Sequence, residues 1–165
     1  MEAEICDAAD AASIVLAEFL PYRFSILAER LSRALGQRYG RAFGLSIPEW
    51  RVMAVLGEGA ECSTKQVIER TEMDRVKVSR AVIRLAAVGL VAQTPLLEDQ
   101  RARMLSLTPR GQGVYRQIVQ IARRFQAEFI AVLDPQEMGV LETILAKLQA
   151  SAGRLHDLDL DLGPV

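Results

Sequence analysis

The sequence predicts a mainly α-helical fold with one small β-hairpin. Long stretches repeat apolar residues every three or four positions, two short helical patterns flank a tight turn, and two short strand patterns follow them. Of the 165 residues, 50% are hydrophobic and only 5% are aromatic, which is typical of an aliphatic core between helices. This length suits one domain, so we expect residues 1–165 to form a single-domain chain.

The two short helices are predicted from their first residues. Ser63 can cap a helix, and Gln66 can complete a capping box three residues later, which predicts a helix over about 63–70. Asp74 can cap a second helix over about 75–88, because its carboxylate can accept the free N–H groups of the first turn. Two capped helices about four residues apart indicate a helix-turn-helix.

The second of these helices is predicted to have an apolar side and a basic side. The apolar side consists of Val78, Val82 and Leu85. The basic side consists of Lys77, Arg80 and Arg84. A basic side that starts near a helix N-terminus suits insertion into the major groove of DNA, although an ordinary solvent-exposed charged face has the same pattern.

A hairpin is predicted to follow. Gly89 can end the second helix, and residues 90–94 and 104–108 read as two strands. Arg101 and Arg103 near the tip can enter a minor groove or bind phosphates, and Asp99 can orient Arg101 through a salt bridge. An ordinary charged turn is the alternative. Helices and hairpin together predict a winged helix-turn-helix lobe over residues 46–108.

Segments outside this lobe carry three apolar stripes at helical spacing. They lie in two predicted dimerisation regions, residues 20–42 and 109–155, the second containing one helix from Pro109 and another from about Pro135. The stripes are Leu20, Phe24, Leu27, Leu31 and Leu35; Val114, Ile118, Ile121, Phe125 and Phe129; and Met138, Leu141, Leu145, Leu148, Ala152 and Leu155. Any one of them can fill a monomer core, but three are hard to bury alone. We therefore expect a homodimer, whose two-fold symmetry calls for a palindromic DNA site.

Charge is unevenly distributed along the chain, whose formal net charge is −1. Residues 1–62 carry six basic and nine acidic side chains, residues 63–110 carry nine and five, and residues 111–165 carry five and seven. Positive charge is therefore concentrated in the segment predicted to meet DNA.

The ordered set of motifs resembles the MarR family of bacterial transcription regulators, over roughly residues 20–155. The matching segments are 74–80, Arg84-Leu85, 89–91, 99–101 and 107–111, and residues 44–53 look like the second helix of the family. The wing departs from the family pattern, because Leu96-Leu97 stand in place of a frequent Asp-Pro step and Gln93 in place of a frequent Arg. The Asp-x-Arg element of the tip is kept.

The resemblance implies a DNA-binding repressor, joined as a dimer through its first and last helices and released by a small molecule, often an aromatic acid or phenolic compound. The DNA-contact candidates are Ser63, Thr64, Lys65, Arg75, Val76, Lys77, Ser79, Arg80, Arg84, Asp99, Arg101 and Arg103. The effector-pocket candidates are Tyr22, Arg23, Trp50, Arg51 and Met53. Trp50 can stack an aromatic ring and either arginine can pair with a carboxylate, although Trp50 and Met53 can equally be core residues.

Other functions have less support. Cys6 and Cys62 leave a redox-sensing regulator open, but they match no known sensor motif, disulfide framework or metal spacing. The single histidine, His156, has no metal set near it, and no phosphate loop or nucleophile elbow occurs, so we expect neither an enzyme nor a cofactor. A winged-helix protein interaction module remains a third alternative. The sequence shows neither a signal peptide nor a membrane-length apolar run, which favours a cytoplasmic protein.

Overall fold

The computed structural model describes residues 14–59, 61–95 and 103–155. They form two compact units, one within residues 1–122 and the other within residues 123–165. The first unit holds α1 (Leu20–Phe43), α2 (Ile47–Gly57), β1 (Cys62–Ser63), α3 (Thr64–Thr71), α4 (Arg75–Ala87), β2 (Val91–Pro95) and β3 (Arg103–Leu107). Helix α5 (Pro109–Ile130) begins in the first unit, and α6 (Pro135–Leu155) belongs to the second.

Local capping sets the starts of α3 and α4. The backbone N–H of Gln66 donates to Ser63 Oγ over 3.2 Å, and the Ser63 N–H donates to Gln66 Oε1 over 2.8 Å. Asp74 accepts the N–H of Lys77 at 2.8 Å. These contacts confirm the predicted caps, and the helices begin within one residue of the predicted positions.

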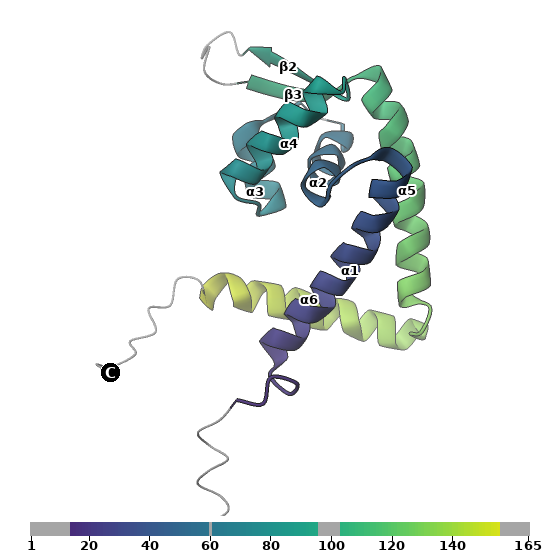
Figure 1. The fold of residues 1–165 in the computed structure, drawn as a ribbon. Coiled ribbons are helices and arrows are strands. Elements are labelled where there is room, and N and C mark those ends of the chain that lie inside the picture. Colours follow the sequence, from purple (N-terminus) through teal and green to yellow (C-terminus); the bar gives the residue numbers. More distant parts are fainter. Residues whose placement is uncertain (1–13, 60, 96–102, 156–165) are drawn as a thin grey trace, which may run out of the picture. The chain divides into compact units, whose positions relative to one another are not determined.

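A tight turn separates α3 from α4. Glu72 ends α3 with φ = 52°, and among the described residues it is the only non-glycine residue with a positive φ. A residue in the left-handed backbone conformation commonly ends a helix, because it turns the chain sharply away from the helix axis. The helix-turn-helix predicted from sequence is therefore present, and Figure 1 shows α2, α3 and α4 grouped beside the hairpin of β2 and β3.

The sheet has three antiparallel strands in the order β1-β3-β2. Val91 pairs with Leu107 and Thr94 with Met104, which confirms the predicted hairpin. The sequence did not predict β1, whose Cys62 pairs with Leu105. Two residues are too few to show the alternation of apolar and polar side chains that predicts a strand. This strand is therefore recognised only by its pairing with β3.

One apolar core joins the helices and the sheet. The predicted apolar side of α4, Val78, Val82 and Leu85, is buried in it, together with Val52 and Met53 of α2. Helix α5 contributes Ile118, with Val114 and Ile121 partly buried beside it. Part of the second predicted stripe therefore fills the core of a single chain.

The other two stripes are only partly covered in the single chain, where Leu35 packs against the core and Leu31, Met138 and Leu141 are half-buried. In α1, Leu20, Phe24 and Leu27 are exposed, and no residue of α6 is buried. Among the described helices, none is both long and apolar enough to cross a bilayer.

Candidate nucleic-acid interface

Helix α4 has one side buried in the core and an opposite side exposed to solvent. Opposite its buried apolar side, the described side chains are exposed, including Val76 with 57% of its surface accessible. The exposed residues that were predicted to contact DNA are Arg75, Val76, Lys77, Ser79 and Arg80. All five lie in the first two turns of the helix, so they can face the edges of bases together.

Asp74 fixes the N-terminal turn of α4. Its two carboxylate oxygens bind Lys77, one through the backbone N–H at 2.8 Å and the other through Nζ at 2.9 Å. The hydrogen bond from the Lys77 N–H, followed by the bond from the Lys77 side chain, lowers the pKa of Asp74 below its ordinary value. Asp74 is therefore ionised at neutral pH and partly neutralises Lys77.

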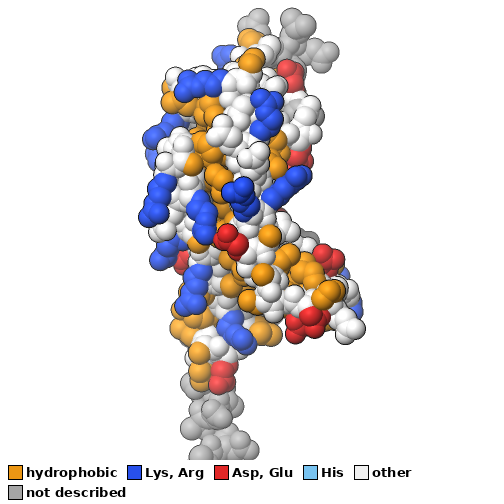
Figure 2. Space-filling view, turned by 90° about the vertical axis from the view of Figure 1, so that its right-hand side faces the viewer, with side chains coloured by type: hydrophobic (Ala, Val, Ile, Leu, Met, Phe, Trp, Pro, Cys, Tyr) orange, Lys and Arg blue, Asp and Glu red, His pale blue; other side chains and the backbone are white. Residues whose placement is uncertain are grey.

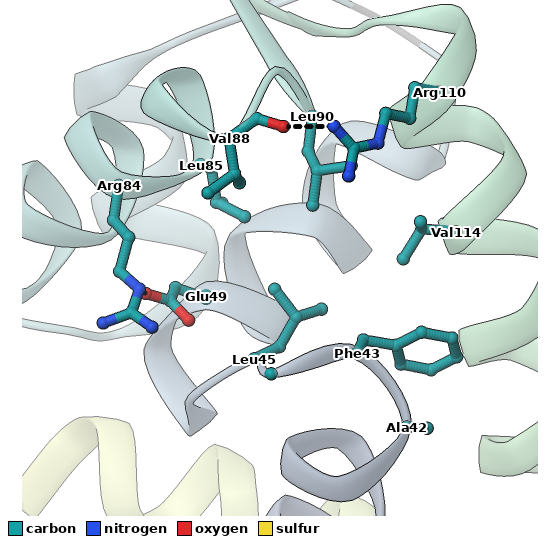
Figure 3. Close-up of a pocket in the computed structure, with 11 residues that line it drawn as sticks. Ala42, Phe43, Leu45, Glu49, Arg84, Leu85, Val88, Leu90, Arg110 and Val114 are labelled. Atoms are coloured by element: carbon teal, nitrogen blue, oxygen red, sulfur yellow. Dashed lines mark hydrogen bonds and ion pairs between the residues drawn. The ribbon is translucent and has the colours of Figure 1, made fainter.

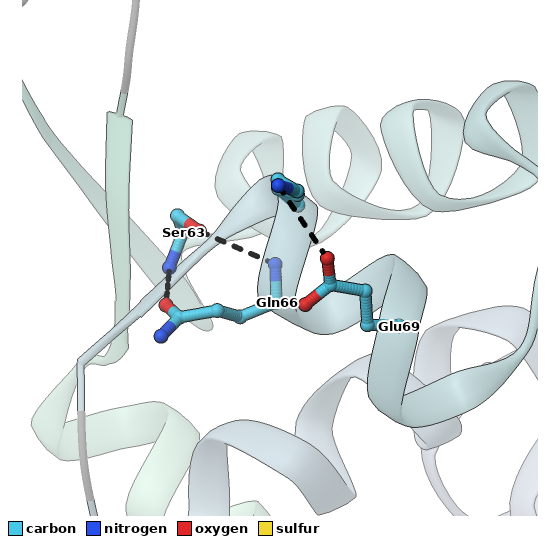
Figure 4. Close-up of polar contacts among 4 residues, drawn as sticks. Ser63, Gln66 and Glu69 are labelled. Atoms are coloured by element: carbon cyan, nitrogen blue, oxygen red, sulfur yellow. Dashed lines mark hydrogen bonds and ion pairs between the residues drawn. The ribbon is translucent and has the colours of Figure 1, made fainter.

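The start of α3 presents the other predicted contacts of the helix-turn-helix. The Ser63 side chain is engaged in its capping box, as Figure 4 shows. Lys65 is exposed, and its Nζ lies 3.7 Å from Oε1 of Glu69 one turn later. Such an exposed pair is weak, so the Lys65 ammonium can exchange Glu69 for a phosphate at little cost.

Arg84 is engaged within the protein. Its Nε donates to Oε1 of Glu49 at 2.9 Å, and Figure 3 shows the side chain reaching from α4 to the first turn of α2. Arg75, Arg80 and Arg103, by contrast, have no ion-pair partner among the described residues. Arg84 thus differs from the other described arginines that were predicted to contact DNA.

Most of the predicted wing tip lies outside the described residues. Arg103 begins β3 and is exposed, at the base of the predicted tip. Asp99 and Arg101, with the salt bridge predicted between them, lie outside the described residues.

The predicted effector pocket is not assembled within one chain. Tyr22 and Arg23 line shallow clefts formed by residues 17–30. Trp50 packs against Tyr39 instead, with ring centroids 5.3 Å apart. Tyr22 and Tyr39 are seventeen positions apart on α1, which corresponds to about 25 Å at 1.5 Å per residue. Of the remaining candidates, Met53 is fully buried in the core and Arg51 is half-buried on α2.

Tyr39 and Trp50 each bury a polar atom. The Tyr39 hydroxyl and the Trp50 Nε1 have no hydrogen-bond partner among the described protein groups. Burial also raises the pKa of Tyr39 above its ordinary value. Tyr39 was not foreseen from the sequence, because a tyrosine on a helix has no local signal that shows its burial.

A cavity of about 380 Å³ lies where the end of α1, α2, α4 and α5 meet. Figure 3 shows the residues that line it, which are Ala42, Phe43, Gly44, Leu45, Glu49, Arg84, Leu85, Val88, Leu90, Arg110 and Val114. Sequence reasoning missed Glu49 and Arg110. The spacing of Ser46 and Glu49 is a capping-box signal, and Glu49 accepts the Ser46 N–H at 2.7 Å. No comparable local signal marks Arg110.

The cysteines add little to the site. Cys62 is buried in β1, with its Sγ 3.7 Å from an Arg70 nitrogen. Cys6 and His156 lie outside the described residues. No group of three or more metal-binding side chains occurs in the part of the chain that the structure describes.

Comparison with known proteins identifies the family that the helix-turn-helix resembles. Residues 43–102 match the MarR family. The homoprotocatechuate degradative operon repressor of Escherichia coli is 28% identical over 106 residues, which cover 62% of this chain and 72% of the repressor.

Solved structures share the fold. A MarR/EmrR family transcriptional regulator from Acinetobacter sp. ADP1 superposes with a TM-score of 0.77 at 24% identity, covering 86% of this chain and 99% of that one. The PcaV transcriptional regulator from Streptomyces coelicolor, solved with its natural ligand, gives a TM-score of 0.69 at 25% identity, with the same coverage. These relatives and structural neighbours are transcriptional regulators, not enzymes.

Proposed function

This chain carries a MarR-family winged helix-turn-helix, and on that premise we propose that it is a homodimeric repressor. It binds a palindromic operator and leaves it when a small aromatic effector binds. The observation that carries this proposal is the exposed, cationic first half of α4, held in place by a buried apolar side and the Asp74 cap.

Recognition by α4 follows from its chemistry. Arg75 and Arg80 have free guanidinium donors among the described residues, and guanine offers two acceptors in the major groove. Lys65 at the start of α3 is suited to a phosphate, where it adds affinity without reading the sequence. The wing residues Arg101 and Arg103 remain proposed contacts with the minor groove or the backbone.

The exposed apolar stripes support a dimer. Leu20, Phe24 and Leu27 of α1 and Leu145 and Leu148 of α6 expose large hydrophobic side chains to solvent. Figure 2 likewise shows hydrophobic side chains between basic ones on the face that it draws. Burial of apolar surface contributes about 25 cal/mol per Å², so a second copy of the chain can stabilise both stripes. Two-fold symmetry then places two α4 helices about 34 Å apart, one turn of DNA.

Release by an effector is supported by the relatives. One is named as the repressor of a homoprotocatechuate degradative operon, and another was solved with its natural ligand. An effector shifts operator occupancy only if it binds one arrangement of the two α4 helices better than the other. The proposed pocket for the effector still consists of Tyr22, Arg23, Trp50, Arg51 and Met53. Because Tyr22 and Arg23 lie far from the other three within one chain, the pocket requires a second copy of the chain.

The test is a titration of purified protein against DNA from upstream of its gene, followed by fluorescence anisotropy at two salt concentrations. We expect saturable, sequence-specific binding that weakens with salt, and release by one member of a panel of aromatic acids. The variant Lys77→Ala is expected to bind more weakly, whereas Arg116→Ala, an exposed arginine of α5, serves as the matched control.

Other outcomes would favour the two alternatives. Specific binding that no acid releases, but that an oxidant does, would favour a redox regulator acting through Cys6 or Cys62. Absence of salt-sensitive binding to any DNA would favour a winged-helix protein interaction module and would overturn the proposal.

A further inference from the structure

We propose that Val76 and Ile83 of α4 determine part of the operator sequence. Each contacts the C5-methyl group of a thymine, and the base pair contacted by Arg80 lies between the two thymines. This inference rests on the proposed function, because it names bases that the proposed repressor reads. Val76 was predicted from the sequence to contact DNA, whereas Ile83 was not.

Large hydrophobic side chains are exposed at few places in the winged helix-turn-helix lobe. Within its described residues they are Val76, Ile83 and Val88, with 57%, 63% and 43% of their surfaces accessible. Val76 and Ile83 lie within α4, and Val88 follows as its C-cap. Single exposed apolar residues are common on protein surfaces. Two on the same side of the helix that is proposed to enter DNA call for a partner with apolar groups.

Val76, Arg80 and Ile83 form one line along α4, which we call its outer face. Val76 and Ile83 are seven positions apart, about 20° short of two full turns, and Arg80 lies between them at a similar angle. The buried side chains of Val78 and Leu85 lie on the opposite side of the helix. The outer face is therefore the part of α4 that points most directly away from the core.

Charged neighbours on one flank of the outer face are held within the protein. Lys77 Nζ lies 2.9 Å from Oδ2 of Asp74, and Arg84 Nε lies 2.9 Å from Oε1 of Glu49. Arg80 has no ion-pair partner among the described residues. The outer face thus presents one free guanidinium between two apolar side chains.

The major groove of DNA has groups that match this face. The C5-methyl group of thymine is an apolar group on a base edge there, and guanine offers two acceptors to an arginine. Seven residues of helix rise about 10 Å, and base pairs stack about 3.4 Å apart. With α4 along the groove, Val76 and Ile83 contact thymines about three base pairs apart, and Arg80 contacts a guanine between them.

The test begins by selecting DNA with the purified full chain from random duplexes of about 24 base pairs, long enough for two half-sites one turn apart. The enriched duplex is then made with deoxyuridine in place of one thymine at a time, symmetrically in both half-sites. Deoxyuridine lacks only the C5-methyl group, and fluorescence anisotropy measures binding. At two positions about three base pairs apart, with a G·C pair between them, wild type should bind about fourfold more weakly for each methyl group removed.

Variants assign each thymine to a side chain. Val76→Ala should lose the sensitivity to deoxyuridine at one of the two positions and keep it at the other, and Ile83→Ala should show the reverse. Both substitutions shorten exposed side chains and alanine favours helix, so both variants should fold, which thermal unfolding checks. Val132→Ala is the matched control, because Val132 is 83% exposed outside the lobe, and it should keep both sensitivities.

Failure of this inference is distinguishable from failure of the proposed function. If wild type binds an enriched sequence equally well with thymine and with deoxyuridine, the inference is wrong and the repressor proposal stands. The same holds if Val76→Ala and Ile83→Ala keep both sensitivities, since the methyl groups then act through other contacts. If no sequence is enriched, both proposals fail, and a protein partner for the outer face is favoured instead.

Discussion

Arg84 and Glu49 form an ion pair that ties α4 to α2. The Nε to Oε1 distance is 2.9 Å, and the Glu49 side chain is 4% exposed whereas that of Arg84 is 68% exposed. Glu49 also closes the capping box of α2. The pair therefore joins the start of a core helix to the helix that is proposed to enter DNA.

Replacing Glu49 by alanine should lower the free energy of unfolding by about 1–3 kcal/mol, because the Ser46 N–H and Arg84 both lose their acceptor. Urea denaturation followed by circular dichroism measures this loss. Glu69→Gln, which breaks the exposed pair with Lys65, should change stability by less than about 0.5 kcal/mol. Equal effects of the two substitutions would contradict a structural role for the Glu49 pair.

Gly111 allows α5 to approach the backbone of Leu90. A Cβ at position 111 would lie 2.0 Å from the Leu90 carbonyl oxygen, whereas a Cβ at Gly113 would meet nothing within 4 Å. Gly111→Ala should therefore destabilise the fold by about 1–3 kcal/mol. Gly113→Ala should stabilise it by up to about 1 kcal/mol, since alanine favours helix. Thermal unfolding compares the two, and a stable Gly111→Ala variant would exclude the close approach.

Asp74 should make stability depend on pH. Its pKa in the folded state is lowered, mainly by the Lys77 N–H, so ionised Asp74 stabilises the fold above its ordinary pKa of about 4. This contribution is lost as pH falls through the lowered pKa. Asp74→Asn keeps an N-cap acceptor without the charge. In thermal unfolding, the midpoint temperature of wild type should be higher than that of Asp74→Asn at pH 7. In strong acid the two midpoint temperatures should become equal.

Arg80 and Lys65 should affect DNA binding differently. Arg80→Ala should cost about 1–3 kcal/mol on the operator and relax the preference at one base pair. Lys65→Ala should weaken binding to all sequences and reduce the slope of log K against log salt by about 0.9. Anisotropy titrations on operator and scrambled DNA measure both. If Arg80→Ala weakens the two DNAs equally, Arg80 contacts phosphate and not a base.

The apolar side of α6 should be required for dimerisation. Leu145→Asp with Leu148→Asp places two charges on it and should give monomers at micromolar concentration, with operator affinity reduced about 100-fold. Ala150→Asp places a charge on the opposite, exposed side of the helix and should remain a dimer. Sedimentation analysis measures the mass, and a double variant that stays dimeric would place the interface elsewhere.

The helix-turn-helix can be predicted from the sequence alone, because the capping contacts that define its two helices span only three residues. Ser63 with Gln66 and Asp74 with Lys77 cap α3 and α4 through contacts that any helix starting there would make. The apolar side of α4 likewise follows from a period of 3.6 residues. The basic residues lie on the opposite side of the same helix, so their exposure can be predicted as well.

Tertiary structure alone decided the features that join distant segments. Arg84 meets Glu49, which lies 35 positions earlier in the chain, and Gly111 contacts Leu90 through a backbone approach that no local pattern encodes. The same holds for Tyr39 beside Trp50 and for the cavity at Arg110. The period of the apolar residues predicts which side of a helix is buried. Which side chains of other elements contact that side depends on the packing of the whole fold.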